Sequence, residues 1–167
     1  RKEDVFEGPE GIGPLTGDNV SAMYELPDGA VAYFNSVRGA GPGGTSRFGL
    51  RINGSKGCID VLTGHLAPMH YLPDPLWSPG RSGKNWIPIS SAGPGKDEPQ
   101  KDQGLHGGNL LAVKDLLAAI EEDRQPECNV FEARWTVEMI AGVFESHRQG
   151  QPVKLPLENR ENPLASL

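Results

Sequence analysis

The hydrophobic pattern of the chain changes its period about two thirds of the way along, and this change limits the fold more than any other feature. Before residue 62, apolar and polar residues alternate in pairs of short segments, as in strands with one buried face. From Asn109 onward, apolar residues recur every three or four positions, as on one face of a helix. Strands followed by helices predict an α+β fold, a mostly antiparallel open-faced β-sheet with two main helices packed on one face.

The first alternating segments, residues 19–26 and 30–37, predict a β-hairpin. They flank Pro27-Asp28-Gly29, a sequence typical of a type I turn in which Gly takes a positive φ. We expect Leu26 to pair with Gly29. This register sets Tyr24 opposite Val31 and keeps one face of both strands apolar.

A second hairpin is predicted around the turn Gly54-Ser55-Lys56-Gly57, between "RFGLRIN" and "CIDVL". Pairing Gly54 with Gly57 sets Arg51 opposite Asp60 and aligns the apolar residues of the two strands in pairs. Further along, "HLAPMHYL" (65–72) and "NWIPI" (85–89) each fit a short strand, which their prolines would restrict to edges or bulges.

Two amphipathic helices are predicted in the last third. The first begins at Asn109 as N-cap and ends by residues 123–126. The second begins after Asn129, and Gly150 caps its end. Its apolar arc spans about half the circumference, so we expect cover on two sides. Arg134 and Glu138 form an i, i+4 pair on its solvated face. "PVKLPL" (152–157) then predicts a short edge strand.

Composition limits the class of protein. The chain has 167 residues, which suits one domain, read as a polar lead-in segment (1–18) and a single α+β domain (19–167). It opens at Arg1 without an initiator Met, so we expect a fragment or a processed product. The net charge is −6 with scattered cations, which argues against a nucleic-acid partner. No apolar run approaches the roughly 18 residues of a membrane helix, and Cys58 and Cys128 are expected to be free thiols.

One glycine-rich stretch, "VRGAGPGGTSRFGL" (37–50), raises the question of a dinucleotide site. Gly39, Gly41 and Gly44 have the spacing G-x-G-x-x-G. In a dinucleotide fold those glycines open a helix, whose N-terminal N–H groups receive the phosphates. Here "TSRFGLRI" follows with the period of a strand. We therefore expect a linker between two hairpins and no nucleotide site in this chain.

Three stretches resemble the C-terminal half of the Gfo/Idh/MocA oxidoreductases, the family of glucose–fructose oxidoreductase and inositol dehydrogenase. They are "FGLRINGSKGCIDV", the helical run from residue 110 to "GQPVKLPL", and the closing "ENRENPL". The order and spacing of these motifs carry the resemblance, which covers most of residues 17–164. It implies the dihydrodipicolinate reductase-like C-terminal fold.

The resemblance also implies a longer enzyme. An N-terminal Rossmann domain of the same polypeptide would hold NAD(P), and the free sheet face would mediate a homo-oligomer. The family's catalytic Lys and Asp/His pair lie upstream of this segment, so no catalytic or cofactor residue is assigned here. Hydride transfer requires cofactor and substrate to be held together, so we expect the isolated chain to be inactive.

Four side chains are candidates for a substrate pocket: His106, Arg47, Trp77 and Trp86. Arginine donors and aromatic faces suit a sugar ring, whereas for the tryptophans a place in the core or in a subunit interface is the favoured interpretation. His106 directly precedes the predicted first helix, where it would cap the helix, sit in a loop or line a pocket. No metal site is predicted, because the two histidines of "GHLAPMH" have no nearby cysteine or carboxylate cluster.

These observations favour the substrate-side and oligomerisation domain of an NAD(P)-dependent dehydrogenase acting on a sugar, cyclitol or related polyol. The chain alone contains no cofactor. A non-catalytic carbohydrate-binding or assembly module is the alternative, and a metal-dependent hydrolase is a third class. We expect a cytoplasmic protein without nucleic-acid or membrane partners, although some relatives are exported.

Overall fold

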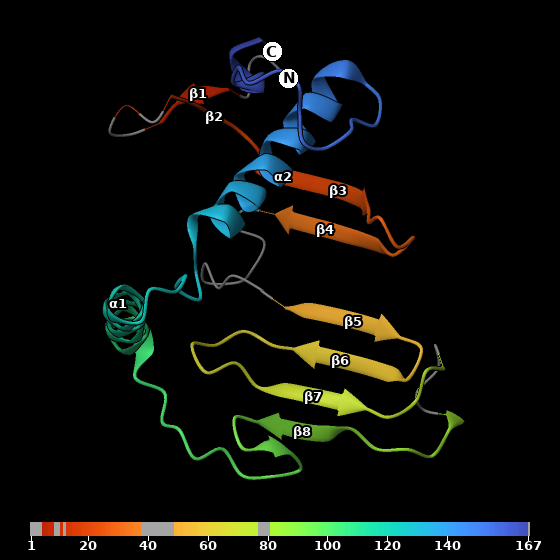
Figure 1. Cartoon of the computed structure of the whole chain (residues 1–167). Coiled ribbons are helices and arrows are strands. Elements are labelled where there is room, and N and C mark those ends of the chain that lie inside the picture. Colours follow the sequence, from red (N-terminus) through yellow and green to blue (C-terminus); the bar gives the residue numbers. More distant parts are fainter. Residues whose placement is uncertain (1–4, 9–10, 12, 38–48, 77–80, 167) are drawn as a thin grey trace. The chain divides into compact units, whose positions relative to one another are not determined.

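The computed structural model describes residues 5–8, 11, 13–37, 49–76 and 81–166, and it divides the chain into two compact units. Unit 1 consists of residues 1–40 and 127–167, and unit 2 of residues 41–126. Within the described residues every strand pairing is antiparallel, and two long helices follow the strands. The α+β prediction is therefore confirmed (Figure 1).

Unit 1 contains two separate two-stranded ribbons. In the first, β1 (Phe6–Glu7) pairs with β2 (Pro14–Leu15). In the second, β3 (Asn19–Glu25) pairs with β4 (Val31–Val37). The predicted hairpin at residues 19–37 is thus confirmed.

The predicted register of this hairpin is wrong by one residue. Leu26 pairs with Ala30, its N–H donating to the Ala30 carbonyl over 2.9 Å, and Tyr24 lies opposite Ala32. The physical reason is Gly29, whose φ of 82° lets it serve as the third residue of the loop and adds one residue to the turn. Val31 consequently belongs to the face opposite that of Tyr24.

The helix α2 (Val130–Gln149) has the ends that the sequence predicts. The Asn129 side chain accepts hydrogen bonds from the N–H groups of Phe131 and Glu132, and Gly150 ends the helix in the left-handed conformation. The inner face of β3 packs against this helix, since the Tyr24 hydroxyl donates to a carbonyl of α2 over 3.3 Å.

Unit 2 is built on a five-stranded sheet with the order β5-β6-β7-β8-β9 (Figure 1). The predicted register of its first hairpin is confirmed, with Arg51 opposite Asp60 and Gly54 opposite Gly57. The two short strands predicted near residues 65–72 and 85–89 are also present. The strand bounds are β5 (Leu50–Gly54), β6 (Gly57–Val61), β7 (Met69–Leu72), β8 (Ile87–Ser90) and β9 (Gly93–Pro94).

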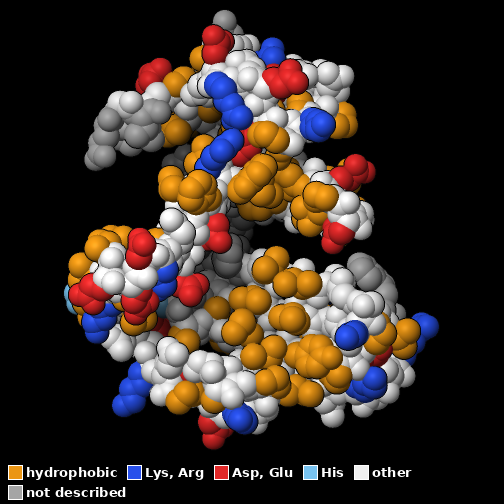
Figure 2. All heavy atoms as spheres, viewed as in Figure 1, with side chains coloured by type: hydrophobic (Ala, Val, Ile, Leu, Met, Phe, Trp, Pro, Cys, Tyr) orange, Lys and Arg blue, Asp and Glu red, His pale blue; other side chains and the backbone are white. Residues whose placement is uncertain are grey.

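One face of this sheet is apolar across four strands. Residues that pair across neighbouring strands share a face, so the register fixes its members. The apolar face consists of Leu50, Ile52, Ile59, Val61, Met69, Tyr71, Ile87 and Ile89. All eight are at least partly accessible to solvent, and Figure 2 shows apolar side chains gathered over these strands. This set of eight is called the open face below.

The opposite face of the sheet holds the small core of unit 2. Leu72 is completely buried, and Cys58 lies opposite it on β6. The Cys58 thiol donates to the backbone carbonyl of Asp74, whose side chain is also buried. Gly57 fits this core because a Cβ there would lie 2.2 Å from the Leu72 carbonyl oxygen. Both cysteines are free thiols, as predicted.

The first long helix, α1 (Gly104–Glu121), begins five residues before the predicted N-cap Asn109. The Asp102 carboxylate accepts the Gly104 N–H over 2.7 Å, so the chain turns into the helix earlier than the apolar pattern indicates. His106 therefore lies inside the first turn of α1, and the prediction that it precedes the helix is wrong.

Among the described residues, unit 1 has two two-stranded antiparallel sheets and unit 2 has one five-stranded antiparallel sheet. Within its own unit, the apolar stripe of α1 is largely exposed: Leu110 is 45% exposed and Ile120 is 69% exposed.

Among the residues described, neither long helix is apolar enough to cross a bilayer.

The Arg51–Asp60 pair gives a first testable prediction. Its two hydrogen bonds measure 2.6 Å each, and the Arg51 guanidinium holds the pKa of Asp60 below its ordinary value. A double-mutant cycle with Arg51→Ala and Asp60→Asn is expected to give about 0.2–1 kcal/mol of coupling by urea denaturation. Because Asp60 has the lower pKa in the folded state, the coupling is complete above its unfolded pKa of about 3.9. It is lost as the pH falls through the folded value. A coupling that stays unchanged down to pH 2 would contradict this assignment.

Candidate functional site

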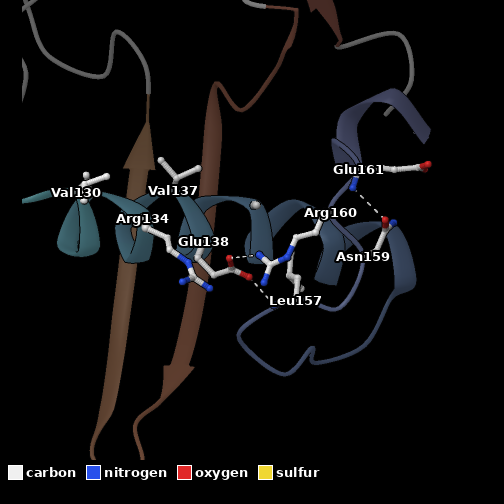
Figure 3. A pocket seen from close by; sticks show the side chains of 10 residues that line it. Val130, Arg134, Val137, Glu138, Leu157, Asn159, Arg160 and Glu161 are labelled. Carbon is white, nitrogen blue, oxygen red and sulfur yellow. Dashed lines mark hydrogen bonds and ion pairs between the residues drawn. The ribbon is translucent and has the colours of Figure 1, made fainter.

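A groove of about 430 Å³ runs along α2 in unit 1 (Figure 3). Its walls come from one face of the helix and from the segment that follows the helix. The positions 130, 134, 137, 138 and 141 share that face, because they recur every three or four residues. The groove is lined by Val130, Ala133, Arg134, Val137, Glu138, Ala141, Leu157, Asn159, Arg160 and Glu161.

Glu138 is the buried polar group of this groove. Its side chain is 6% exposed, although it projects from the middle of a helix. One carboxylate oxygen accepts the backbone N–H of Leu157, and the other accepts the Arg160 guanidinium over 2.6 Å. Figure 3 shows the carboxylate between Arg134 and Arg160. The prediction of a solvated Arg134–Glu138 pair is therefore wrong, because the closing segment of the chain covers Glu138.

These contacts determine what Glu138 can do chemically. The Leu157 N–H, followed by the Arg160 guanidinium, holds the pKa of the Glu138 carboxyl below its usual range. A general acid at neutral pH needs the opposite shift, so that the carboxyl keeps its proton. Both carboxylate oxygens are already engaged with the chain's own donors. Glu138 therefore holds in place the chain segment that contains Leu157 and Arg160.

The segment that covers Glu138 corrects a further prediction. Residues 152–157 were expected to form an edge strand, but the structure contains no strand there. Pro152 and Pro156 have no N–H to donate to a ladder, and the N–H of Leu157 is used by Glu138. The segment also crosses α2 closely, because a Cβ at Gly142 would lie 2.9 Å from a methyl carbon of Leu155.

A second buried carboxylate, Glu145, lies two turns further along α2. It is 3% exposed, and it accepts hydrogen bonds from the side chains of Arg148 and Gln149 over 2.6–2.8 Å. The Arg148 guanidinium and then the Gln149 amide lower the pKa of Glu145 to about 2. The buried residues of α2 are thus Glu138, Gly142 and Glu145. Its apolar residues Trp135 and Val137 are 51% and 65% exposed within unit 1, so the expected cover on two sides is not present there.

The four pocket candidates from the sequence are placed only in part. Arg47 and Trp77 lie outside the described residues. His106 is exposed in the first turn of α1, and Trp86 is half-buried immediately before β8. Among the described residues, no hydrogen bond or ion pair joins His106 to Trp86. These residues stay predictions.

The burial of Glu138 and Glu145 and the contact of Arg160 with Glu138 were not predicted from the sequence. Two signals were available: the carboxylates at positions 138 and 145, seven residues apart on one helix face, and the polar motif "ENRENPL" at residues 158–164, after the helix. Neither signal shows by itself that a carboxylate is buried, because the segment that covers it is irregular and its sequence has no hydrophobic period.

The flanks of the glycine stretch test the fit of a dinucleotide. The glycines themselves lie outside the described residues, but the element before them is β4 and the element after them is β5. A pyrophosphate site of this type needs a helix N-terminus after the glycines, where β5 stands. The described strands on either side of the glycines therefore do not fit a pyrophosphate site of this type. In the described ranges no three His, Cys, Asp or Glu side chains converge as metal ligands would.

Comparison with known families decides which class of protein this is. The Gfo/Idh/MocA model described as "Oxidoreductase family, C-terminal alpha/beta domain" matches residues 4–155. The chain belongs to this family. The resemblance seen in the sequence motifs is therefore confirmed, over nearly the same part of the chain. No curated protein and no solved structure matches it significantly.

Membership in the Gfo/Idh/MocA family indicates what kind of longer protein contains such a domain. The family is associated with NAD(P)-dependent oxidoreductases, and a C-terminal domain of this family implies an N-terminal partner domain. The match includes the five-stranded sheet, α1 and α2. It ends at residue 155, before Leu157 and Arg160, the two residues that bind the Glu138 carboxylate.

Proposed function

We propose that this chain is the substrate-side and oligomerisation domain of an NAD(P)-dependent oxidoreductase that acts on a sugar, cyclitol or related polyol. The family match over residues 4–155 carries the proposal. The cofactor is held by an N-terminal Rossmann domain of the same polypeptide, in agreement with the poor fit of this chain to a dinucleotide. The substrate pocket is completed by this chain, with His106, Arg47, Trp77 and Trp86 as the candidates. The enzyme is cytoplasmic.

The open face of unit 2 supports the oligomer part of the proposal. Eight apolar side chains on four strands remain accessible within the unit, and Leu50 and Ile52 are 54% and 49% exposed. Apolar patches of this kind mark interaction surfaces. A homo-oligomer formed through this face covers it with a second copy. The other face of the same sheet carries the Arg51–Asp60 pair and the small core of unit 2.

The test compares this chain with the longer parent polypeptide that includes the preceding domain. The parent is expected to bind NAD(P)H, measured by fluorescence, and to reduce NAD(P)+ with a member of a panel of inositols and hexoses. The chain alone is expected to do neither, because positioning of hydride donor and acceptor needs both domains.

In the active parent, Trp86→Ala is expected to raise the polyol KM more than it lowers kcat.

Three results would contradict the proposal. If the chain alone bound NAD(P)H, the cofactor site would lie in this chain and not in the N-terminal Rossmann domain. A parent that binds sugars but no dinucleotide would favour the alternative, a carbohydrate-binding or assembly module. A parent that reduces NAD(P)+ only with substrates other than polyols would overturn the substrate class.

A further inference from the structure

The closing segment of the chain contacts both the main helix of unit 1 and the first ribbon. We call residues Leu157–Ser166 the strap. Its last part is the 3-10 helix η5 (Pro163–Ser166), which packs against α2 and β2. Leu157 and Leu164 are 7% and 9% exposed. The Asn162 side chain accepts the Leu164 N–H over 3.0 Å and so fixes the start of η5.

The strap is attached to α2 by the Glu138 carboxylate (Figure 3). This carboxylate holds the first residue of the strap through the Leu157 N–H, and its fourth residue through Arg160. The two attachments use opposite oxygens of one buried group. Removing the negative charge of the carboxylate therefore weakens both hydrogen bonds at once, because hydrogen bonds to an ionised acceptor are about twice as strong as neutral ones.

The other end of the strap meets the β1–β2 ribbon. Each of these strands has only two residues, and the Gly8 N–H donates to the Gly13 carbonyl over 2.8 Å. An isolated two-stranded ribbon is marginally stable at best, so this one needs a support. The contact between β2 and η5 supplies such a support.

We propose that the strap fixes the β1–β2 ribbon onto α2, with Glu138 as its latch. The ribbon is the first described part of the chain, and on the proposed function it follows the N-terminal Rossmann domain. The strap then sets the position at which that domain is joined. It lies beyond residue 155, outside the part of the chain that the family match describes.

Hydrogen exchange followed by mass spectrometry tests the latch on this chain alone. In Glu138→Gln, we expect the peptides containing Gly8 and Leu164 to exchange at least tenfold faster than in the wild type. Peptides of the five-stranded sheet should not change. Glu161→Gln is the matched control, since its carboxylate is an exposed one on the strap itself. If Glu138→Gln does not fold, Arg160→Gln removes only the 57%-exposed partner.

The outcomes separate the parts of the proposal. Faster exchange in the strap with an unchanged Gly8 peptide would show that the strap does not hold the ribbon. Unchanged exchange in both, or equal acceleration in the control, would show that Glu138 is not the latch. Either result overturns the proposal.

A second measurement tests the role in joining the domains. In the parent polypeptide, Glu138→Gln is expected to raise the polyol KM about tenfold while the NAD(P)H Kd stays unchanged. An unchanged KM would overturn this role. An inactive wild-type parent would count against the proposed function, and the exchange result on the latch would be independent of it.

Discussion

An Ile52→Asp variant is expected to be a monomer at concentrations at which the wild-type chain forms a homo-oligomer. Ile52 lies in the middle of β5 on the open face, paired with Ile59 of the neighbouring strand. Burying an unpaired carboxylate in an interface costs several kcal/mol, and each 1.4 kcal/mol corresponds to a factor of ten in Kd. The expected weakening is therefore at least about 100-fold. Sedimentation velocity over a concentration series measures it directly.

The matched control is Asn53→Asp, the next residue along the same strand. It adds the same charge but belongs to the opposite face of the sheet, where it lies opposite Cys58. Its association is expected to equal that of the wild type. If both variants dissociate equally, general charge repulsion is responsible. A wild-type chain that is monomeric at every concentration would exclude the open face as a self-association surface in this chain.

Leu72→Ala is expected to have the largest effect on stability of any single truncation in unit 2. Leu72 is completely buried on β7, opposite Cys58, in the small core of that unit. Removing a buried leucine side chain costs about 2–5 kcal/mol, because transfer free energy is lost and a cavity remains. Urea denaturation monitored by circular dichroism should show a lower midpoint for the unfolding of unit 2.

Leu62→Ala provides the comparison for this experiment. Leu62 directly follows β6 and is 49% exposed, so its truncation should change the free energy of unfolding by less than about 0.5 kcal/mol. A Leu72 variant as stable as the Leu62 variant would mean that Leu72 does not form the core of unit 2.

The two hairpins show how far the sequence determines a register. In the second, two glycines flank the turn, the charges of Arg51 and Asp60 are opposite, and each apolar residue finds an apolar partner in a single alignment. These local constraints agree, and the predicted register is confirmed. In the first, the three-residue loop uses the positive φ of Gly29 and the Asp28 carboxylate, which accepts the Ala30 N–H, and the apolar pattern does not report either. A shift of one residue moves every side chain to the other face.

The helices show the same division between local and non-local information. The ends of α2 were predictable because Asn129 and Gly150 act on their own neighbours. The start of α1 was not, because the helix begins at Gly104, whose N–H the Asp102 carboxylate accepts, five residues before the predicted N-cap Asn109. The burial of Glu138 was also not predictable, since it depends on a segment some twenty residues away that approaches without a regular pattern. From the helical periodicity alone, an i, i+4 charge pair such as Arg134–Glu138 is predicted to lie on the solvent-exposed face.

The alternation along β5 and β6 has a consequence for protein engineering. Neighbouring positions such as 51 and 52 point to opposite sides of one sheet, and Gly57 is confined by the carbonyl of Leu72. On β5, assembly and surface chemistry can therefore be redesigned separately by choosing every second residue, while Gly57 at the turn and the buried Cys58 of β6 are kept. Libraries built on one set of alternate positions should leave the other set's behaviour intact.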